Sequence, residues 1–309
     1  MNIIFMGTPK FAVPCLKSLI EAGHKIKCVV TQPDKPSGRG YKITYPEVKQ
    51  CALDYGLEVF QPSRLRDDGV EQKLKSFDAD VIVVVAYGKI LPKYILDMPK
   101  YGCINVHGSL LPKYRGAAPI QWSVINGESK TGVTTMYMDE TMDTGDIILK
   151  SETEIGANET SGELYDRLSE MGANLIVETI KKLEKGNVER IKQQNEDATY
   201  APMLEKSMGK IDWNKSSLKI HNLIRGVNPW PIAHTKFKGK TLKIYNSEII
   251  FGKGGKSGEI ISVKPLQVAC GDGNSIELKE VQLEGKKRMM AEDFARGYRI
   301  EVGAFFEME

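Results

Sequence analysis

Short apolar runs alternate with amphipathic stretches along the N-terminal two-thirds of the chain. This alternation is typical of a largely parallel β-sheet that is covered by helices. The run Val81–Val85 is apolar throughout, which indicates a central parallel strand buried on both faces. We therefore predict an α/β domain with a Rossmann-like, mostly parallel sheet and with strands at 2–6, 26–31, 58–61, 81–85, 103–107 and 133–137.

Helical periodicity occupies the intervals between these strands, and it predicts helices at 11–21, 47–55, 69–75 and 119–126. A longer helix is expected after Thr160-Ser161-Gly162-Glu163, which resembles a capping box. Its leucines recur with helical spacing until Gly186, a residue that favours a helix C-terminus. This helix is expected to pack on the sheet.

The pattern changes after residue 186. Periodicity fades over 187–208, which predicts a linker. The remaining part carries short strand candidates at 241–250, 258–263, 267–270 and 275–282, separated by Gly-rich or Pro-containing turns. We predict a catalytic domain at 1–186, a linker at 187–208, and a small β-barrel of the OB type at 209–309.

Charge is divided unevenly along the chain. Residues 206–309 contain 18 Lys and Arg against 12 Asp and Glu, whereas residues 1–205 contain 25 against 28. A basic C-terminal part points toward a polyanion such as RNA. A lysine-rich solvated surface is an equally good explanation of the charge alone.

The composition also limits the class of protein. The first residues lack a basic segment and a cleavage site, and no apolar run reaches the roughly 18 residues of a membrane span. We expect a cytoplasmic protein with neither a membrane nor DNA as a partner. The five cysteines form no C-x-x-C pair, so we expect reduced, buried thiols and no metal site.

Candidate chemistry lies at the end of the predicted strand 103–107. Asn105 and His107 are two residues apart, so in an extended strand they share a face. Asp143 follows in Met142-Asp143-Thr144-Gly145-Asp146. An amide donor, an imidazole and a carboxylate that orients or charges it are the parts that acyl transfer requires. The absence of G-x-G-x-x-G and of a phosphate-binding loop argues against NAD and ATP.

The other three histidines, His24, His221 and His234, lack metal-ligand spacing and are expected to be structural.

The sequence from Asn105 to Gly116, NVHGSLLPKYRG, with Asp143-Thr144-Gly145 downstream, resembles the 10-formyltetrahydrofolate-dependent formyltransferases. The resemblance extends over nearly the whole chain. Further matching segments are 5–9, 31–40, 86–92, 116–121 and 228–231.

The resemblance implies Asn105, His107 and Asp143 as catalytic residues, and 10-formyltetrahydrofolate as the cosubstrate, with no metal. Asp143 would keep the imidazole oriented and charged. The acceptor would be the methionine amino group of initiator methionyl-tRNA. The residues that border the folate would be Ile90, Leu91, Ser109, Leu110, Leu111 and Pro112.

Contacts to tRNA are also implied by the resemblance. The loop 32–45 carries Lys35, Arg39 and Lys42, which could contact phosphates, as could Lys206 and Lys210. This loop is less basic than the family pattern. Without the resemblance, a solvated mobile loop would be the simpler interpretation.

Three alternatives remain at this point. A formyltransferase for an amino sugar nucleotide would share the catalytic trio, and one for glycinamide ribonucleotide would resemble only the first two-thirds. The chain could also be a noncatalytic RNA-binding protein, although an intact Asn, His and Asp constellation disfavours this.

Overall fold

The computed structural model describes residues 1–37 and 42–307. The chain divides into two compact units, which we describe separately. The first comprises Met1–Gly116, Thr131–Thr153 and Tyr165–Ala201; the second comprises Ala117–Lys130, Glu154–Leu164 and Pro202–Glu309. The linear division into 1–186, 187–208 and 209–309 stays a prediction about independent domains.

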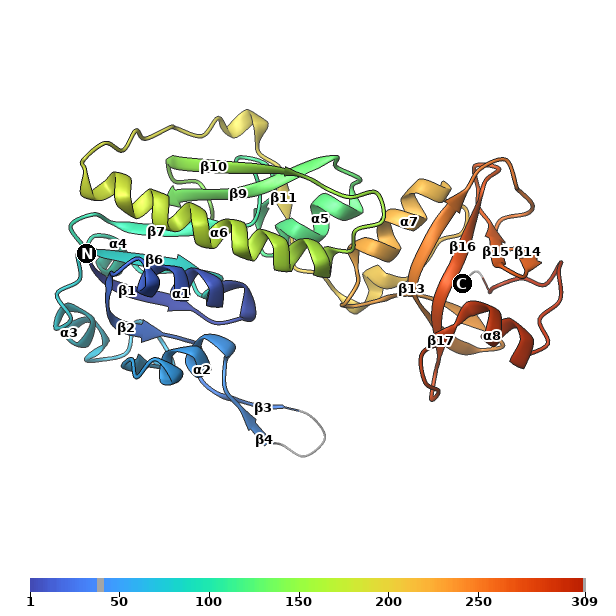
Figure 1. Cartoon of the computed structure of the whole chain (residues 1–309), viewed down its shortest axis with the longest axis horizontal. Coiled ribbons are helices and arrows are strands. Elements are labelled where there is room, and N and C mark those ends of the chain that lie inside the picture. The colour runs from blue at the N-terminus through green and yellow to red at the C-terminus, as the bar shows by residue number, and fades with distance from the viewer. Residues whose placement is uncertain (38–41, 308–309) are drawn as a thin grey trace. The chain divides into compact units, whose positions relative to one another are not determined.

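A seven-stranded sheet forms the first unit, in the order β10-β9-β7-β6-β1-β2-β5 (Figure 1). The five strands from β7 to β5 are parallel, and β9 runs antiparallel to β7. This confirms the predicted mostly parallel α/β sheet. Its strands are β1 (Asn2–Gly7), β2 (Lys25–Val30), β5 (Val59–Phe60), β6 (Val81–Val85), β7 (Cys103–His107), β9 (Lys130–Tyr137) and β10 (Ile147–Glu154).

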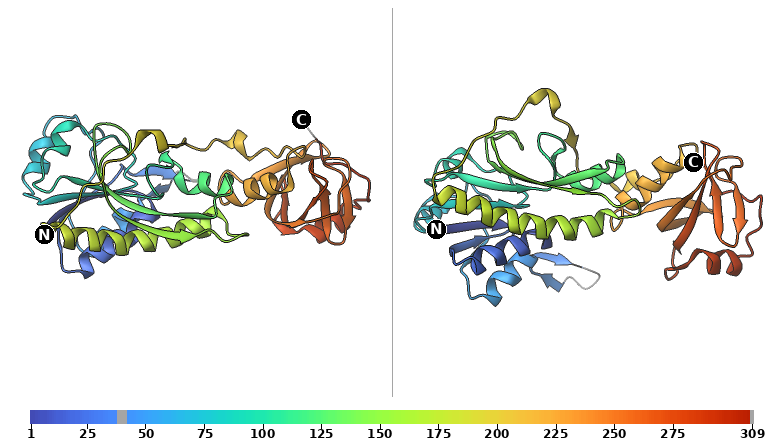
Figure 2. Two further views of the ribbon diagram at one scale, coloured as in Figure 1. Left: turned by 90° about the horizontal axis from the view of Figure 1, so that it is seen from above. Right: turned by 45° about the horizontal axis from the view of Figure 1, so that its top comes forward.

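Helices cover both faces of this sheet (Figure 2). One face packs the apolar side chains of α3 and α4 against Ile4 and Ile82. On the other face, Gly172 of α6 lets the helix approach Val106 of β7, since an added Cβ would lie 3.0 Å from its Cγ1. The helices are η1 (Lys10–Ala12), α1 (Val13–Glu21), α2 (Glu47–Asp54), α3 (Val70–Lys75), α4 (Lys93–Leu96) and α6 (Ser161–Glu184).

Two small features of the first unit escaped the sequence analysis. The stretch after β2 forms a hairpin of β3 (Lys35–Ser37) and β4 (Lys42–Thr44). Further on, β8 (Arg115–Gly116) pairs in parallel with β11 (Tyr200–Ala201). Because β11 lies within the segment predicted as a linker, part of that segment is built into the first unit.

The second unit contains a largely antiparallel sheet in the order β12-β13-β16-β15-β14, with β17 beside β16. Trp213, Phe294 and Phe306 are fully buried in its core, where Trp213 stacks on Phe306. Its strands are β12 (Ala233–Phe237), β13 (Lys240–Ile250), β14 (Ile260–Val263), β15 (Leu266–Ala269), β16 (Ser275–Leu283) and β17 (Met289–Met290). The helices of the second unit are α5 (Pro119–Ile125), η3 (Lys206–Gly209), α7 (Ser217–Gly226) and α8 (Ala291–Gly297), whereas η2 (Asn195–Asp197) belongs to the first unit.

The sheet of the second unit is open by strand order, so the predicted barrel is not established by the strands alone. The described part of the chain contains no helix that is long and apolar enough to span a membrane. All five cysteines are buried and unbridged, as predicted, and burial raises the pKa of Cys15 to about 12.

Candidate active site

Strand β7 places Asn105 and His107 on one face at the carboxyl end of the sheet. Asn105 pairs with Val84 of β6, and His107 pairs with Thr134 of β9, so both side chains are carried by a central strand. Their exposed fractions are only 9% and 6%. Ligand sites of open α/β sheets lie beyond the carboxyl ends of the strands, which is where these residues lie.

The imidazole of His107 is held by a backbone carbonyl. Its Nε2 lies 2.9 Å from the carbonyl oxygen of Tyr114, which can only accept, so Nε2 carries the proton. Nδ1 faces the carboxylate of Asp143, 3.8 Å from Oδ2, beyond hydrogen-bond distance. Asp143 was expected to orient the ring, but at this distance it makes no direct hydrogen bond to Nδ1. The ring is held by the Tyr114 carbonyl.

Asp143 itself is fixed by the backbone of another motif. Its Oδ2 accepts a hydrogen bond of 2.8 Å from the backbone N–H of Gly116. Its φ of 56° lies in the left-handed region, which an Asp tolerates better than most residues. Two residues later, a side chain at Gly145 would collide with the carbonyl of Tyr137, so the glycine permits this loop geometry.

A buried polar cluster also holds the loop that carries Asp143, and the sequence does not predict it. Gln193 donates to the carbonyl oxygens of Asp143, at 2.9 Å, and Gly145, at 2.7 Å. Its own Oε1 accepts from Arg115 Nε at 3.1 Å and Nη2 at 2.8 Å. Arg115 stands in the recognised motif, but Gln193 stands in a polar stretch without periodicity, where no sequence signal marks it.

The residues predicted to border the folate differ in what they expose. The side chains of Leu91, Ser109 and Leu111 are at most 3% exposed, whereas Ile90 is 76% exposed. Leu110 and Pro112 are intermediate. The turn is rigid, because Thr134 Oγ1 of β9 donates to the Ser109 carbonyl and accepts from the Leu111 N–H. Ligand contacts would therefore come from Ile90, the partly exposed residues and the turn backbone.

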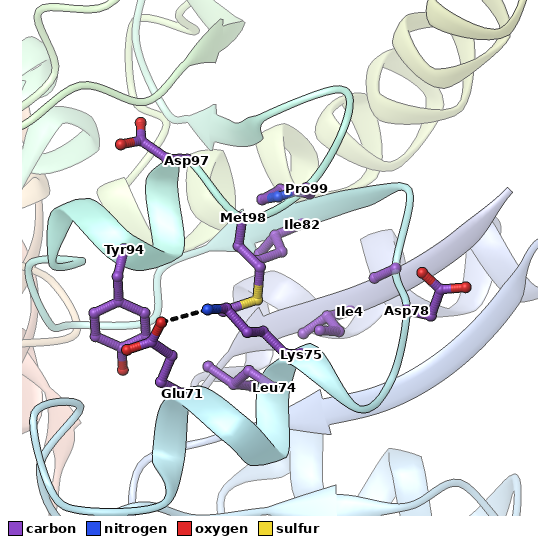
Figure 3. Close-up of a pocket in the computed structure, with 11 residues that line it drawn as sticks. Ile4, Glu71, Leu74, Lys75, Asp78, Ile82, Tyr94, Asp97, Met98 and Pro99 are labelled. Atoms are coloured by element: carbon purple, nitrogen blue, oxygen red, sulfur yellow. Dashed lines mark hydrogen bonds and ion pairs between the residues drawn. The ribbon is translucent and has the colours of Figure 1, made fainter.

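Two pockets in the first unit lie outside the trio. One, of about 490 Å³, is lined by Tyr94, Met98 and the ion-paired Glu71 and Lys75, between α3 and α4 (Figure 3). It contains none of the predicted site residues. The other, of about 460 Å³, is lined among others by Thr144, Gly145 and Gln193, and so flanks the loop that carries Asp143.

The predicted tRNA-contacting residues lie in both units. Lys35 in β3 and Lys206 in η3 are exposed, and Lys210 follows η3 and is exposed too. Arg39 lies outside the described residues, and Lys42 is placed only as a backbone position in β4.

The carboxylate of Asp34, next to Lys35 in the sequence, is paired with a different lysine. Its Oδ2 lies 2.6 Å from Lys49 Nζ, and Gln61 Nε2 donates to its Oδ1 at 2.9 Å. These bonds lower the pKa of Asp34, the hydrogen bond from Lys49 contributing most. The carboxylate is therefore neutralised at the base of the β3–β4 hairpin by a lysine of α2.

The side chains of the candidate site suit the transfer of an acyl group. Within residues 1–37 and 42–307, no cluster of three or more His, Cys, Asp or Glu side chains could hold a metal ion. An amide, an imidazole and a carboxylate gather instead at the end of β7, where they can stabilise charge on an oxygen and handle a proton.

Two family models match the chain. Residues 1–180 match the formyl transferase family, and residues 203–299 match the formyl transferase C-terminal domain.

Individual proteins are similar over the full length. The methionyl-tRNA formyltransferase of Agathobacter rectalis is 53% identical over 100% of both chains. That of Alkaliphilus oremlandii is 54% identical over 98% of both. Among solved structures, an N-formyltransferase from Helicobacter canadensis, in complex with folinic acid and dTDP-3-aminofucose, has a TM-score of 0.67 at 21% identity, with 89% of this chain and 98% of that chain covered. The last likeness shows the fold alone.

Proposed function

Since the chain belongs to the formyl transferase family, we propose that it moves the formyl group of 10-formyltetrahydrofolate to the methionine α-amino group of initiator tRNA. It is an enzyme that formylates methionyl-tRNA with a folate cosubstrate. The formylated tRNA is used in translation initiation. The observation that carries the assignment of the site is the approach of His107 Nδ1 to Asp143 Oδ2, 3.8 Å, with Asn105 two residues earlier on the same strand face.

The geometry supports a catalytic role for each member of the trio. The amine that attacks the formyl carbon drives negative charge onto the formyl oxygen, and Asn105 can donate a hydrogen bond there. Since His107 Nε2 is committed to the Tyr114 carbonyl, Nδ1 is the ring nitrogen that faces the reacting groups. Asp143 can take the proton of the amine, directly or through water.

The cosubstrate fits the surroundings of the trio. The folate supplies the formyl group: once the amine has added to the formyl carbon, the bond from that carbon to the folate nitrogen breaks, and tetrahydrofolate leaves as that nitrogen gains a proton. We assign its contacts to the exposed side chain of Ile90, to the adjacent buried Leu91, and to the turn at Ser109, Leu110, Leu111 and Pro112. A turn fixed to β9 suits this role, because it costs no ordering when a ligand binds.

The second substrate is a polyanion, and its proposed contacts are the exposed Lys35 and Lys206, with Lys210, Arg39 and Lys42 beside them in sequence. Phosphate contacts position a nucleic acid without reading its sequence. The basic excess after residue 205 supports a tRNA-binding role for the second unit. DNA and membranes are not among the partners that we propose, and the location that we propose is the cytoplasm, where methionyl-tRNA is made and used.

We also propose an OB-like barrel for the second unit. Its sheet ends at β12 and β14, and the C-terminal segment bonds to both sides: Phe306 N–H donates to Gly258 O at 3.0 Å, and Glu307 N–H donates to Lys236 O at 3.1 Å. A segment that pairs with both edges is what closing such a sheet requires.

Acceptor choice tests the proposed function. The purified protein is given 10-formyltetrahydrofolate labelled in the formyl group, together with methionyl initiator tRNA or, separately, a dTDP-linked amino sugar. We expect label in the tRNA, in N-formylmethionine after hydrolysis, and none in the sugar. Elongator methionyl-tRNA serves as the matched control for recognition of the initiator. Label in the sugar nucleotide alone would overturn the proposal.

A further inference from the structure

Gln193 lies between the candidate catalytic loop and a buried cation. It is 8% exposed, and Arg115 is 3% exposed. One end of its amide donates to the carbonyls of Asp143 and Gly145, and the other end accepts twice from Arg115. The carbonyls can only accept and the guanidinium can only donate, so these partners fix the orientation of the amide.

These bonds close a ring around Asp143. Arg115 holds Gln193, Gln193 holds the Asp143 carbonyl, and the Asp143 carboxylate accepts from the N–H of Gly116, the neighbour of Arg115. Both the main chain and the side chain of Asp143 are thereby fixed to one site in β8. The left-handed φ of Asp143 makes this support necessary, because a strained residue keeps its conformation only when its surroundings determine it.

The segment that carries Gln193 is itself tied to β8. Thr199 accepts from the Arg115 N–H through its carbonyl at 2.8 Å, and its Oγ1 accepts from the Tyr114 N–H at 2.8 Å. Tyr114 is the residue whose carbonyl holds His107. The stretch 193–199 therefore bonds to the backbone of the loop that carries Asp143 and to the backbone of Tyr114, which holds His107.

We propose that Gln193, held by Arg115, is a positioning residue for formyl transfer: it acts on the reaction only through Asp143, whose loop it fixes. The inference rests on the proposed function, because it assumes that Asp143 takes part in that reaction. Gln193 bonds to the backbone of the loop, at the carbonyls of Asp143 and Gly145. A supporting group of this kind holds a reacting side chain within the narrow limits that catalysis needs.

A double-mutant cycle tests this role. Single-turnover formylation of methionyl-tRNA is measured for the wild type, Gln193→Met, Asp143→Ala and the double variant, with thermal unfolding of each. Gln193→Met should slow the wild-type reaction about tenfold or more, because displacement of a reacting group by 1 Å costs this much. In the Asp143→Ala background, the same change should alter the rate by less than about twofold, since coupled residues are not additive.

Two further variants complete the experiment. Gln194→Met makes the same chemical change at the exposed neighbouring residue and should leave the rate at the wild-type value. Gln193→Glu keeps the size of the side chain and its acceptors for Arg115 but loses the donors to the loop. It should slow the reaction as the Met variant does, and it carries the test if Gln193→Met does not fold.

The possible outcomes distinguish failure of the positioning role from failure of the proposed function. An equal loss of rate in both backgrounds would show that Gln193 acts independently of Asp143 and would overturn the positioning role. So would an unchanged rate in the folded Gln193→Glu variant. If Asp143→Ala were as fast as the wild type, the positioning role would fall with that of Asp143. Failure of the wild type to formylate methionyl-tRNA would instead overturn the proposed function.

Discussion

The backbone N–H of Gly116 donates to Oδ2 of Asp143 at 2.8 Å, which joins two motifs separated by 27 positions along the chain. The glycine is needed for this contact. Its φ is 124°, and a Cβ added there would lie 2.6 Å from the carbonyl oxygen of Ala201 in β11. Only a residue without a side chain lets β8 approach β11 while it presents its N–H to the carboxylate.

Gly116→Ala should therefore damage both stability and catalysis. The clash with Ala201 should lower the free energy of unfolding by about 1–3 kcal/mol, the range of overpacking and backbone strain. Displacement of the N–H should also slow formylation. Gly186→Ala is the control for a positive φ, since its φ is 67° but nothing lies within 4 Å of the added Cβ. Denaturant unfolding and initial rates measure the two effects; equal rates in Gly116→Ala and Gly186→Ala would contradict the role of this contact.

The proposed tRNA contacts predict a dependence on salt. If Arg39 and Lys206 each neutralise a phosphate, Arg39→Ala or Lys206→Ala should reduce the slope of log K against log salt by about 0.7–0.9. Lys75→Ala is the control, because this lysine already pairs with Glu71. Filter binding of methionyl-tRNA over a range of salt concentrations gives the slopes. Slopes that match the wild type in both variants would remove these cations from the interface.

Packing of α5 against α7 should stabilise the second unit. A Cβ at Gly226 would lie 2.5 Å from Ile125 Cγ1 and 3.0 Å from the Ile125 nitrogen. Gly226→Ala should therefore destabilise the protein by about 1–3 kcal/mol. Gly297→Ala, in α8 with nothing within 4 Å of the added Cβ, should be neutral or slightly stabilising. If Gly226→Ala unfolded at the same denaturant midpoint as the wild type, the prediction would be wrong, because the added Cβ would then be accommodated between α5 and α7 without loss of stability.

Stability should fall on the acid side because of His221. Burial lowers the pKa of His221, and its Nε2 donates to the Ala157 carbonyl. The unfolded chain thus binds a proton more tightly, so the contribution is complete above about pH 6.5 and is lost as the pH falls below it. His221→Gln should show a smaller drop in Tm between pH 7.5 and pH 5 than the wild type. An equal drop in both proteins would exclude His221 as its source.

The central sheet could be predicted because a buried parallel strand is a short, continuous apolar run, whereas the helices between the strands repeat their apolar residues with helical spacing. β6 and β7 match the predicted ranges, and the trio lies where the strand ends. The sequence analysis named no element at α7 or β12, although Ile220, Leu223 and Ile224 of α7 recur with helical spacing. Polar support was also hidden: Gln193 is buried only because Arg115 and two carbonyls meet it, and no local pattern encodes a contact between residues so far apart.

The hydrogen-bond partner of His107 could not be predicted from the sequence either. The resemblance suggested Asp143 as the residue that orients the ring, yet the ring is held by the Tyr114 carbonyl, a backbone group that any residue could supply. Such a bond depends on the path of the turn, and residue identity does not reveal it.

The central claim is that Asn105, His107 and Asp143 carry the formyl transfer, and single-turnover kinetics with enzyme in excess test it most directly. Formation of N-formylmethionyl-tRNA is followed for the wild type, Asn105→Ala and Asp143→Ala, after unfolding curves have shown that all three are folded. We expect each variant to be slower by about 100-fold or more, because each loses an interaction made with charge in the transition state. Near-normal rates in either folded variant would contradict the account for that residue.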